Sequence, residues 1–260
     1  MDMPKLTAFA HRLADAAREE TMWRWREGCR VDGKSGGIDF DPVTDADREA
    51  ERALRRLIEA DYPEHGIAGE EFPDRVAQGA YIWSLDPVDG TRSFICRLPN
   101  WVTLIALLEE GRPVIGVIDA PCLGERYVGA GEDGRFFSAE GEAPLRVSGC
   151  TRMDEARLST TDPYLFLGAE KEGFERLRGQ VRTTRYGHDG YAYARLAAGS
   201  LDLVVESMLK PHDYNALIPV VRAGGGVIGD WRGGEDFSEG KVIAAASREL
   251  YEAAVREMSQ

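Results

Sequence analysis

The 260-residue sequence predicts an α+β protein in which layered sheets are covered by helices. Three observations support this class. The chain opens with two helical stretches, its middle section reads as consecutive antiparallel strands, and its second half mixes short strands with helices. The middle section is not an alternating series of strands and helices, so a parallel sheet is not predicted there.

The first two elements are helices. Residues 5–26 carry apolar side chains at helical spacing and predict an amphipathic helix that covers the core. Residues 48–60 predict a second helix, preceded by Thr44 and Asp47 at capping-box spacing. Taken alone, Asp47 is explained by the helix dipole, which favours an acid in the first turn.

Two short segments near these helices carry polar side chains. Residues 28–39 are rich in glycine, which predicts a mobile connecting loop whose Lys34 could close over a phosphate. Residues 67–72 end in the adjacent acids Glu70 and Glu71, one of which is free to point inward.

The central motif follows the apolar run 81–85, which predicts a buried strand. The strand leads into Asp86-Pro-Val-Asp-Gly-Thr91, where two carboxylates can converge on one point. Gly90 allows backbone to approach a ligand, and amides at a helix start near Thr91 would form an anion site. Carboxylates beside such amides suggest metal-assisted attack on a phosphate ester, although a solvated turn is the alternative.

The rest of the chain supplies the layers. The middle strands are predicted at residues 102–108, 113–120, 125–130 and 135–137. Later strands are predicted at 156–160, 183–185, 201–206, 227–231 and 242–246, with helices at 173–178, 191–198, from Asp213 as N-cap to 223, and from 249. We therefore expect one compact unit with two halves, residues 1–144 and 145–260.

Composition limits the partners. The formal charge of −13 argues against nucleic acid or an anionic membrane as the main partner. A phosphate substrate would then need local cations, and metal ions are the obvious candidates. No signal-like start and no apolar run of bilayer length is present, and four separated cysteines (Cys29, Cys96, Cys122 and Cys150) favour a reduced, cytoplasmic setting.

Several motifs together resemble the inositol monophosphatase family, part of a superfamily of Mg²⁺-dependent, Li⁺-sensitive phosphatases that includes fructose bisphosphatases. They are Asp41-Pro-Val-Thr-Asp-Ala-Asp47, Gly69-Glu-Glu71, Asp86-Pro-Val-Asp-Gly-Thr91 and His212-Asp213. Further stretches are most similar to the histidinol-phosphatase branch: Lys34-Ser-Gly-Gly37, Ser93-Phe-Ile95, Thr103-Leu-Ile-Ala-Leu107, Asp189-Gly-Tyr-Ala-Tyr193 and Leu209-Lys-Pro-His-Asp-Tyr214. The resemblance implies an αβαβα sandwich and a homodimer.

The resemblance also implies a site with two or three Mg²⁺ ions and a water nucleophile activated by metal. It assigns the metal ligands to Glu70, Asp86, the carbonyl of Val88, Asp89 and Asp213. Glu70 would activate the water, supported by Thr91 hydrogen-bonded to Asp47. The phosphate would lie at Asp89, Gly90, Thr91 and Asp213.

The substrate wall implied by the resemblance comprises Arg185, Asp189 and Glu206. Acids there would suit the amine and imidazole of histidinol phosphate, although Arg185 and Asp189 could instead form a structural ion pair. His188 and Gly190 depart from the histidinol-phosphatase pattern, which puts the substrate in doubt.

We therefore expect a histidinol-phosphate phosphatase of histidine biosynthesis. The alternative substrate is inositol 1-phosphate. An alternative of another class is a catalytically silent protein that binds metal or phosphate, which the full set of acids disfavours.

Overall fold

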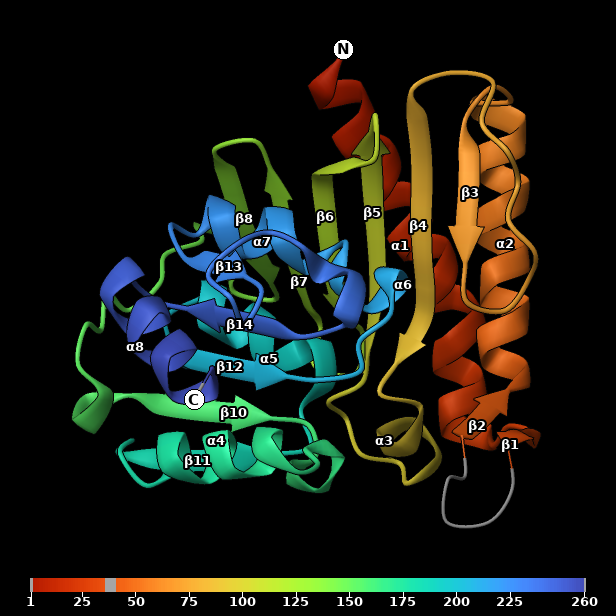
Figure 1. Cartoon of the computed structure of the whole chain (residues 1–260). Helices are drawn as coiled ribbons and strands as arrows, with labels where there is room; N and C mark the ends of the chain where they lie inside the picture. Colours follow the sequence, from red (N-terminus) through yellow and green to blue (C-terminus); the bar gives the residue numbers. More distant parts are fainter. Residues whose placement is uncertain (1, 36–40, 260) are drawn as a thin grey trace.

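Five layers of helices and sheets stack in the order α–β–α–β–α in the computed structural model (Figure 1), which describes residues 2–35 and 41–259. The predicted sandwich is confirmed. The outer layers are α1 (Met3–Glu27) with α2 (Asp45–Asp61), and α4 (Ala169–Arg178) with α8 (Arg248–Met258); the central helices are α5 (Asp189–Ala197) and α7 (Leu217–Ala223).

The first sheet has seven strands, and their order in space follows the chain. They are β3 (Gly66–Gly69), β4 (Tyr81–Asp89), β5 (Val102–Glu109), β6 (Arg112–Ala120), β7 (Glu125–Ala130), β8 (Asp133–Ser138) and β9 (Gly141–Pro144). Only β3 and β4 pair in parallel, and every later pair is antiparallel. The series of hairpins predicted for the middle section is therefore confirmed, with β9 as an additional strand.

The second sheet has five strands and is built from residues 157–245. Its order is β11 (Thr183–Tyr186), β10 (Arg157–Thr160), β12 (Leu203–Glu206), β14 (Val242–Ala245) and β13 (Val227–Gly229). Short 3₁₀ helices lie at η2 (Met153–Glu155), η3 (Pro163–Leu165) and η4 (Phe237–Glu239).

The apolar core fills the spaces between the layers. Trp83 and Leu85 of β4 belong to the cluster formed with α1 and α2. Since successive side chains of a strand point to opposite faces, Ser84 and Asp86 face the central helices. This alternation aims Asp86 at the inside of the sandwich, where the second half of the chain packs.

Two local predictions differ from the structure. Residues 28–39 do not form only a loop, because Val31–Ser35 is strand β1, which pairs antiparallel with β2 (Asp41–Thr44). The partner strand supplies backbone hydrogen bonds that the glycine-rich composition does not reveal. Residues 36–40, which include Gly36 and Gly37 of the predicted phosphate-covering loop, lie outside the described residues.

The predicted N-cap at Asp213 is also wrong. Lys210 is the N-cap of the short helix α6 (Pro211–Tyr214), and Asp213 lies inside its first turn. The Asp213 carboxylate accepts a hydrogen bond from the Lys210 amide at 2.7 Å. The predicted single helix is divided into α6 and α7, and this break presents Asp213 at the end of a separate short helix.

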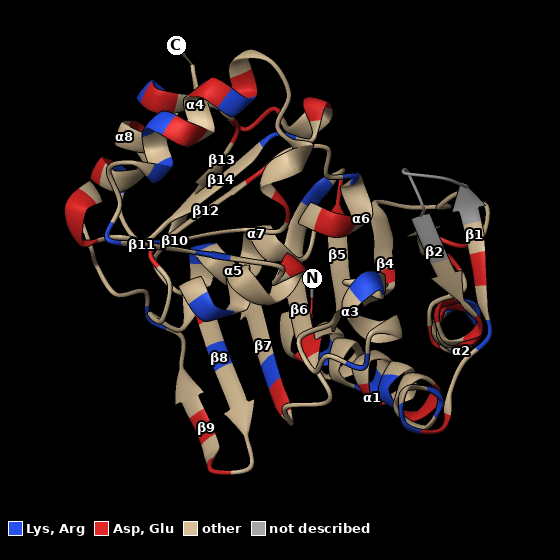
Figure 2. Cartoon of the chain, turned by 90° about the horizontal axis from the view of Figure 1, so that it is seen from below, with Lys and Arg blue, Asp and Glu red and all other residues tan. Residues whose placement is uncertain are grey.

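Charged side chains cover the outer layers. Acidic and basic residues are interspersed along α1 and α4 (Figure 2). Across the described ranges, no helix is both long and apolar enough to cross a bilayer.

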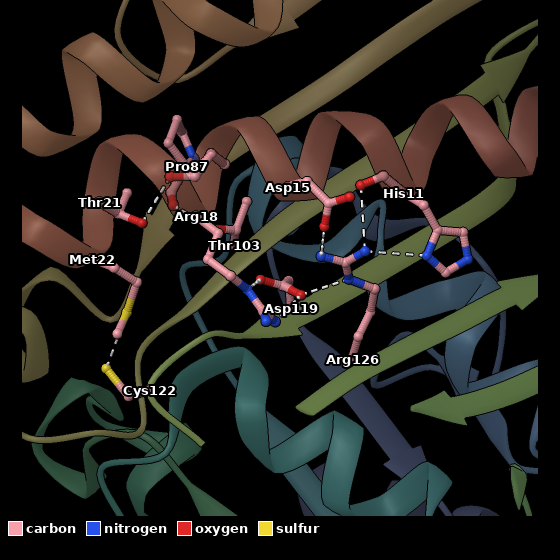
Figure 3. A network of polar contacts seen from close by, with 11 residues as sticks. His11, Asp15, Arg18, Thr21, Met22, Pro87, Thr103, Asp119, Cys122 and Arg126 are labelled. Carbon is pink, nitrogen blue, oxygen red and sulfur yellow. Dashed lines mark hydrogen bonds and ion pairs between the residues drawn. The ribbon is translucent and has the colours of Figure 1, made fainter. Parts of the chain in front are cut away.

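A buried ion network joins α1 to the first sheet. Asp119 of β6 is fully buried and accepts two hydrogen bonds from Arg18, at 2.7 and 3.1 Å, and one from Arg126 of β7, at 2.6 Å. Figure 3 shows Arg126 continuing to Asp15 and His11 of α1. Asp119 therefore balances the positive charges of two guanidinium groups, those of Arg18 and Arg126.

We expect Asp119→Asn to destabilise the fold by about 3–5 kcal/mol, because two cations would lose their buried partner. Urea unfolding measures this change in the free energy of unfolding. Asp15→Asn is the matched control, since the side chain of Asp15 is 64% exposed and contributes about 0–1 kcal/mol. Equal effects of the two substitutions would contradict the assignment.

Candidate active site

An irregularity in strand pairing shapes the turn at the end of β4. The register between β4 and β5 shifts between Asp86 and Asp89, which leaves Pro87 and Val88 outside the regular ladder. The hydroxyl of Thr103 on β5 donates to the Pro87 carbonyl at 2.7 Å, and the Val88 amide donates to Asp86 at 3.2 Å. The two carboxylates of the motif are thereby fixed on one side of the turn.

Gly90 continues the chain in a conformation that suits glycine, with φ of +83°. Helix α3 (Thr91–Ile95) starts directly after it. The amides of Gly90 and Thr91 donate to no other described residue, so both donors are available. This agrees with the donor arrangement expected for a phosphate.

Asp213 reaches the same place from the second half of the chain. Oxygen atoms of Asp86, Asp89 and Asp213 lie within 4.8 Å of one another. Burial raises the pKa of Asp86 well above its usual range, and the charges of Glu70, Asp89 and Asp213 raise it further. Burial likewise raises the pKa of Asp89. The cluster is therefore costly to ionise without a cation.

Asp89 is held by the start of α5. Its carboxylate accepts a hydrogen bond from the Gly190 amide at 2.6 Å. A Cβ at position 190 would lie 2.7 Å from the same carboxylate oxygen, so glycine permits this approach. Gly190, which departs from the histidinol-phosphatase pattern, is thus needed where it stands.

A second acidic group adjoins the first. Oxygen atoms of Asp47, Glu70 and Glu71 lie within 4.8 Å of one another. Burial raises the pKa of Asp47 to about 7, while its hydrogen bonds from Thr44 oppose this shift. The capping box is confirmed, so Asp47 caps α2 and faces the acids at the same time.

The sequence motifs point to Glu70 alone, but the side chain of the adjacent Glu71 is only 3% exposed. Glu51 of α2 lies in no such motif; it is fully buried and accepts a hydrogen bond from the Glu71 amide at 2.8 Å. Arg55 donates to Glu51 at 2.7 Å and to the Phe72 carbonyl at 3.0 Å. In the sequence, only the adjacency of Glu70 and Glu71 indicates this arrangement. The hydrogen bond from the Glu71 amide to Glu51 joins segments that are distant in the chain, and the sequence does not reveal it.

A cavity of about 310 Å³ opens beside the acids. Its lining includes Glu70, Asp89 and Asp213 together with the predicted substrate residues Asp189 and Glu206. Arg92 and Lys210 contribute positive charge to the same wall. The structure thus brings most of the predicted site residues to one hollow.

Asp189 lies closest to the central turn. Its φ of +45° is unusual for a residue with a side chain, and its carboxylate oxygen is 3.0 Å from the position that a Gly90 Cβ would occupy. Burial raises its pKa to about 6, whereas the charge of Arg92 lowers it. The Asp189 carboxylate therefore lies between the turn at Gly90 and the cavity.

Glu206 also lines the cavity. It accepts hydrogen bonds from the Thr161 amide at 2.7 Å, the Thr161 hydroxyl at 3.0 Å and the Thr160 hydroxyl at 3.2 Å. Burial nevertheless raises its pKa to about 8. Burial therefore favours the uncharged form of this carboxyl group.

Two predicted contacts are not formed. The Thr91 hydroxyl donates to the Val88 carbonyl at 3.1 Å, and Asp47 is bonded to Thr44, so the expected Thr91–Asp47 pair is absent from the described residues. Arg185 is exposed and lines a separate hollow with His188 and Arg195. It does not line the cavity with Asp189 and Glu206, and among the described residues no ion pair joins it to Asp189, so its role toward the substrate stays a prediction.

The donor set suits a hard divalent cation. Both groups offer carboxylate oxygens alone, without thiol or imidazole ligands, and oxygen ligands are what Mg²⁺, Ca²⁺ and Mn²⁺ prefer. Positive charge would also offset the repulsion among the buried acids. The residues present therefore fit a metal-dependent site.

Comparison with known proteins identifies the family to which the chain belongs. Residues 2–260 match the inositol monophosphatase family. The chain is 40% identical to the bifunctional phosphatase IMPL2 of Arabidopsis thaliana over 95% of this chain and 70% of that protein. It is 38% identical to the histidinol-phosphatase of Mycobacterium tuberculosis, covering 82% of this chain and 84% of the relative.

A solved structure of an inositol monophosphatase from Zymomonas mobilis covers the whole chain, and is itself wholly covered, with a TM-score of 0.87 and 39% identity. Hydrolysis of phosphate monoesters is the activity of this family, and its members depend on metal ions. The fold, the clustered acids and the full-length match lead to one conclusion: this chain belongs to the inositol monophosphatase family and is a phosphoric monoester hydrolase.

Proposed function

We propose that the protein is a Mg²⁺-dependent phosphatase that hydrolyses histidinol phosphate in histidine biosynthesis. The observation that carries the proposal is the gathering of Asp86, Asp89 and Asp213 beside a cavity whose wall also carries Asp189 and Glu206. The first group suits metal and phosphate, and the wall suits a positively charged leaving group.

The proposed metal ligands are Glu70, Asp86, the carbonyl of Val88, Asp89 and Asp213, around two or three Mg²⁺ ions. When bound, the ions supply positive charge to the phosphate oxygens and acidify a water molecule for attack. A carboxylate oxygen of Glu70 orients that water and accepts its proton. Asp47 and Thr91 support this arrangement from α2 and α3 respectively.

The proposed phosphate site uses donors that have no other described partner. The amides of Gly90 and Thr91 lie at the turn between the end of β4 at Asp89 and the start of α3. Fixed amides of this kind stabilise developing negative charge without reorganising during the reaction. The phosphate would therefore be held between these amides and the metal ligands Asp89 and Asp213.

Asp189 and Glu206 are the proposed readers of the leaving group. An ammonium or imidazolium group stabilises a carboxylate, so a cationic substrate would favour the ionised form of both side chains. Inositol 1-phosphate is the second candidate, because burial favours the uncharged form of Glu206, which can both donate hydrogen bonds to sugar hydroxyl groups and accept them.

We also propose a cytoplasmic homodimer. The cytoplasmic location is supported by Cys29, Cys96, Cys122 and Cys150, which are all free thiols. Sedimentation of the purified protein would measure the oligomeric state.

Phosphate release from histidinol phosphate and from inositol 1-phosphate, each with Mg²⁺ and with EDTA, tests the proposal. We expect activity only with Mg²⁺ and a higher kcat/KM for histidinol phosphate. A preference for inositol 1-phosphate would reject the proposed substrate, and activity retained in EDTA would reject the metal site.

Asp89→Asn should lower turnover by more than about 100-fold. Losing a group that only orients a metal ligand costs about 10- to 100-fold, and Asp89 is proposed as a ligand itself. The asparagine can still accept from the Gly190 amide, and the acidic cluster loses one negative charge. The melting temperature without metal should therefore be unchanged or higher, while stabilisation by Mg²⁺ is lost. Calorimetric melting with and without Mg²⁺ measures both effects, and normal turnover at saturating Mg²⁺ would refute the role.

Glu70→Gln should reduce kcat by about 10²–10⁴, the usual contribution of a general base, with a smaller rise in KM. Steady-state kinetics at saturating Mg²⁺ separates the two constants. A change confined to KM would make Glu70 a binding residue instead of the base.

Asp189→Asn should lower kcat/KM for histidinol phosphate by roughly 10- to 100-fold, the loss expected for a charged hydrogen bond. Asparagine tolerates the left-handed backbone at this position, so the fold should be retained. The uncharged leaving group of inositol 1-phosphate provides the internal control, and equal losses on both substrates would contradict charge recognition.

A further inference from the structure

One buried hydrogen bond joins the two halves of the chain next to the acids. The side-chain amide of Asn215 donates to the Ser84 hydroxyl at 3.1 Å across 131 residues of sequence. Ser84 is 3% exposed and Asn215 is 8% exposed. Neither residue lies in the motifs that the sequence singled out.

Each partner stands two residues from a carboxylate of the cluster. Ser84 and Asp86 share one face of β4, since side chains of a strand alternate. Asn215 follows directly after α6, which carries Asp213. The bond therefore ties the two backbone segments together immediately beside the oxygens that must converge.

These segments are under repulsion from the acids themselves. Asp86, Asp89 and Asp213 place carboxylates within 4.8 Å, and like charges at this spacing push apart. The bond between an amide and a hydroxyl carries no net charge. It opposes the separation without adding to the crowded charge and without using a metal ligand.

Apolar and backbone contacts also hold α6 and α7. Tyr214 of α6 packs against the apolar core and lies 5.3 Å from Phe237 between ring centroids. A Cβ at Gly116 would lie 2.1 Å from the Ala216 carbonyl, and one at Gly129 would lie 2.3 Å from the Pro219 carbonyl, so α7 and the residue before it pack directly on the sheet. This contact fixes the chain after the break, whereas Asn215 fixes the end of α6 against β4.

We propose that Ser84 and Asn215 are positioning residues that set the spacing between Asp86 and Asp213 and so hold the cluster ready to bind metal. This inference rests on the proposed metal site. Partners that orient ligands indirectly commonly change metal affinity by about 10- to 100-fold when removed.

The test measures Mg²⁺ binding to the full chain by calorimetry for the unaltered protein, Ser84→Ala, Asn215→Ala and the double variant. We expect each single substitution to raise the Kd for Mg²⁺ by about tenfold. The Kd of the double variant should equal that of the single variant that binds Mg²⁺ more weakly, because both substitutions remove the same hydrogen bond. In phosphate release, kcat at saturating Mg²⁺ should stay within about threefold of the unaltered protein.

Tyr251→Phe provides the control for a general loss of stability. Tyr251 of α8 is 1% exposed, and its hydroxyl donates to the Asp230 carbonyl at 2.8 Å, away from the cluster. This variant should lower the melting temperature without changing the Kd for Mg²⁺.

Three results would overturn the inference. These are a Kd for Mg²⁺ within twofold of the unaltered protein in both single variants, multiplicative effects in the double variant, or an equal rise in Tyr251→Phe. If the unaltered protein binds no Mg²⁺, the proposed function fails as well, so the two failures are distinguishable.

Discussion

Mutual repulsion among buried carboxylates is the constraint on which this structure depends. Asp86, Asp89 and Asp213 are brought within a few ångströms by elements from both halves of the chain. Burial and neighbouring charge raise the pKa of each carboxyl group, so their ionised forms are unfavourable in the folded chain without a cation. A divalent cation bound among the carboxylates replaces their mutual repulsion by attraction to the cation, so metal binding would stabilise the arrangement of the site.

The scaffold meets this constraint with ordinary hydrogen bonds made by residues other than the proposed metal ligands. Thr103 fixes the bulged turn, the Gly190 amide orients Asp89, and Glu51 clamps the segment that carries Glu70. The layers make these contacts possible because α6 lies against the inner face of β4 (Figure 1), where Asn215 bonds to Ser84. Site geometry therefore follows from where the sheets and helices pack.

The sequence predicted the features that are local in the chain. The antiparallel middle section and the capping box at Thr44 follow from periodicity and residue spacing, and the structure confirms them. The sandwich was implied by the resemblance to the family and is also confirmed. The sequence could not predict the break after Asp213, the hollow that Arg185 lines, or the buried position of Glu71. Those features depend on which distant segments pack together, and a single sequence carries little signal for such contacts.

Diffraction from crystals grown with Mn²⁺ and inorganic phosphate tests the central claim most directly, because anomalous scattering locates the ions without assumptions about activity. The account predicts at least two Mn²⁺ peaks, at distances that permit coordination by Glu70, Asp86, Asp89 and Asp213, with phosphate at the Gly90 and Thr91 amides. Ions bound elsewhere, or a cluster that remains free of metal in saturating Mn²⁺, would contradict it.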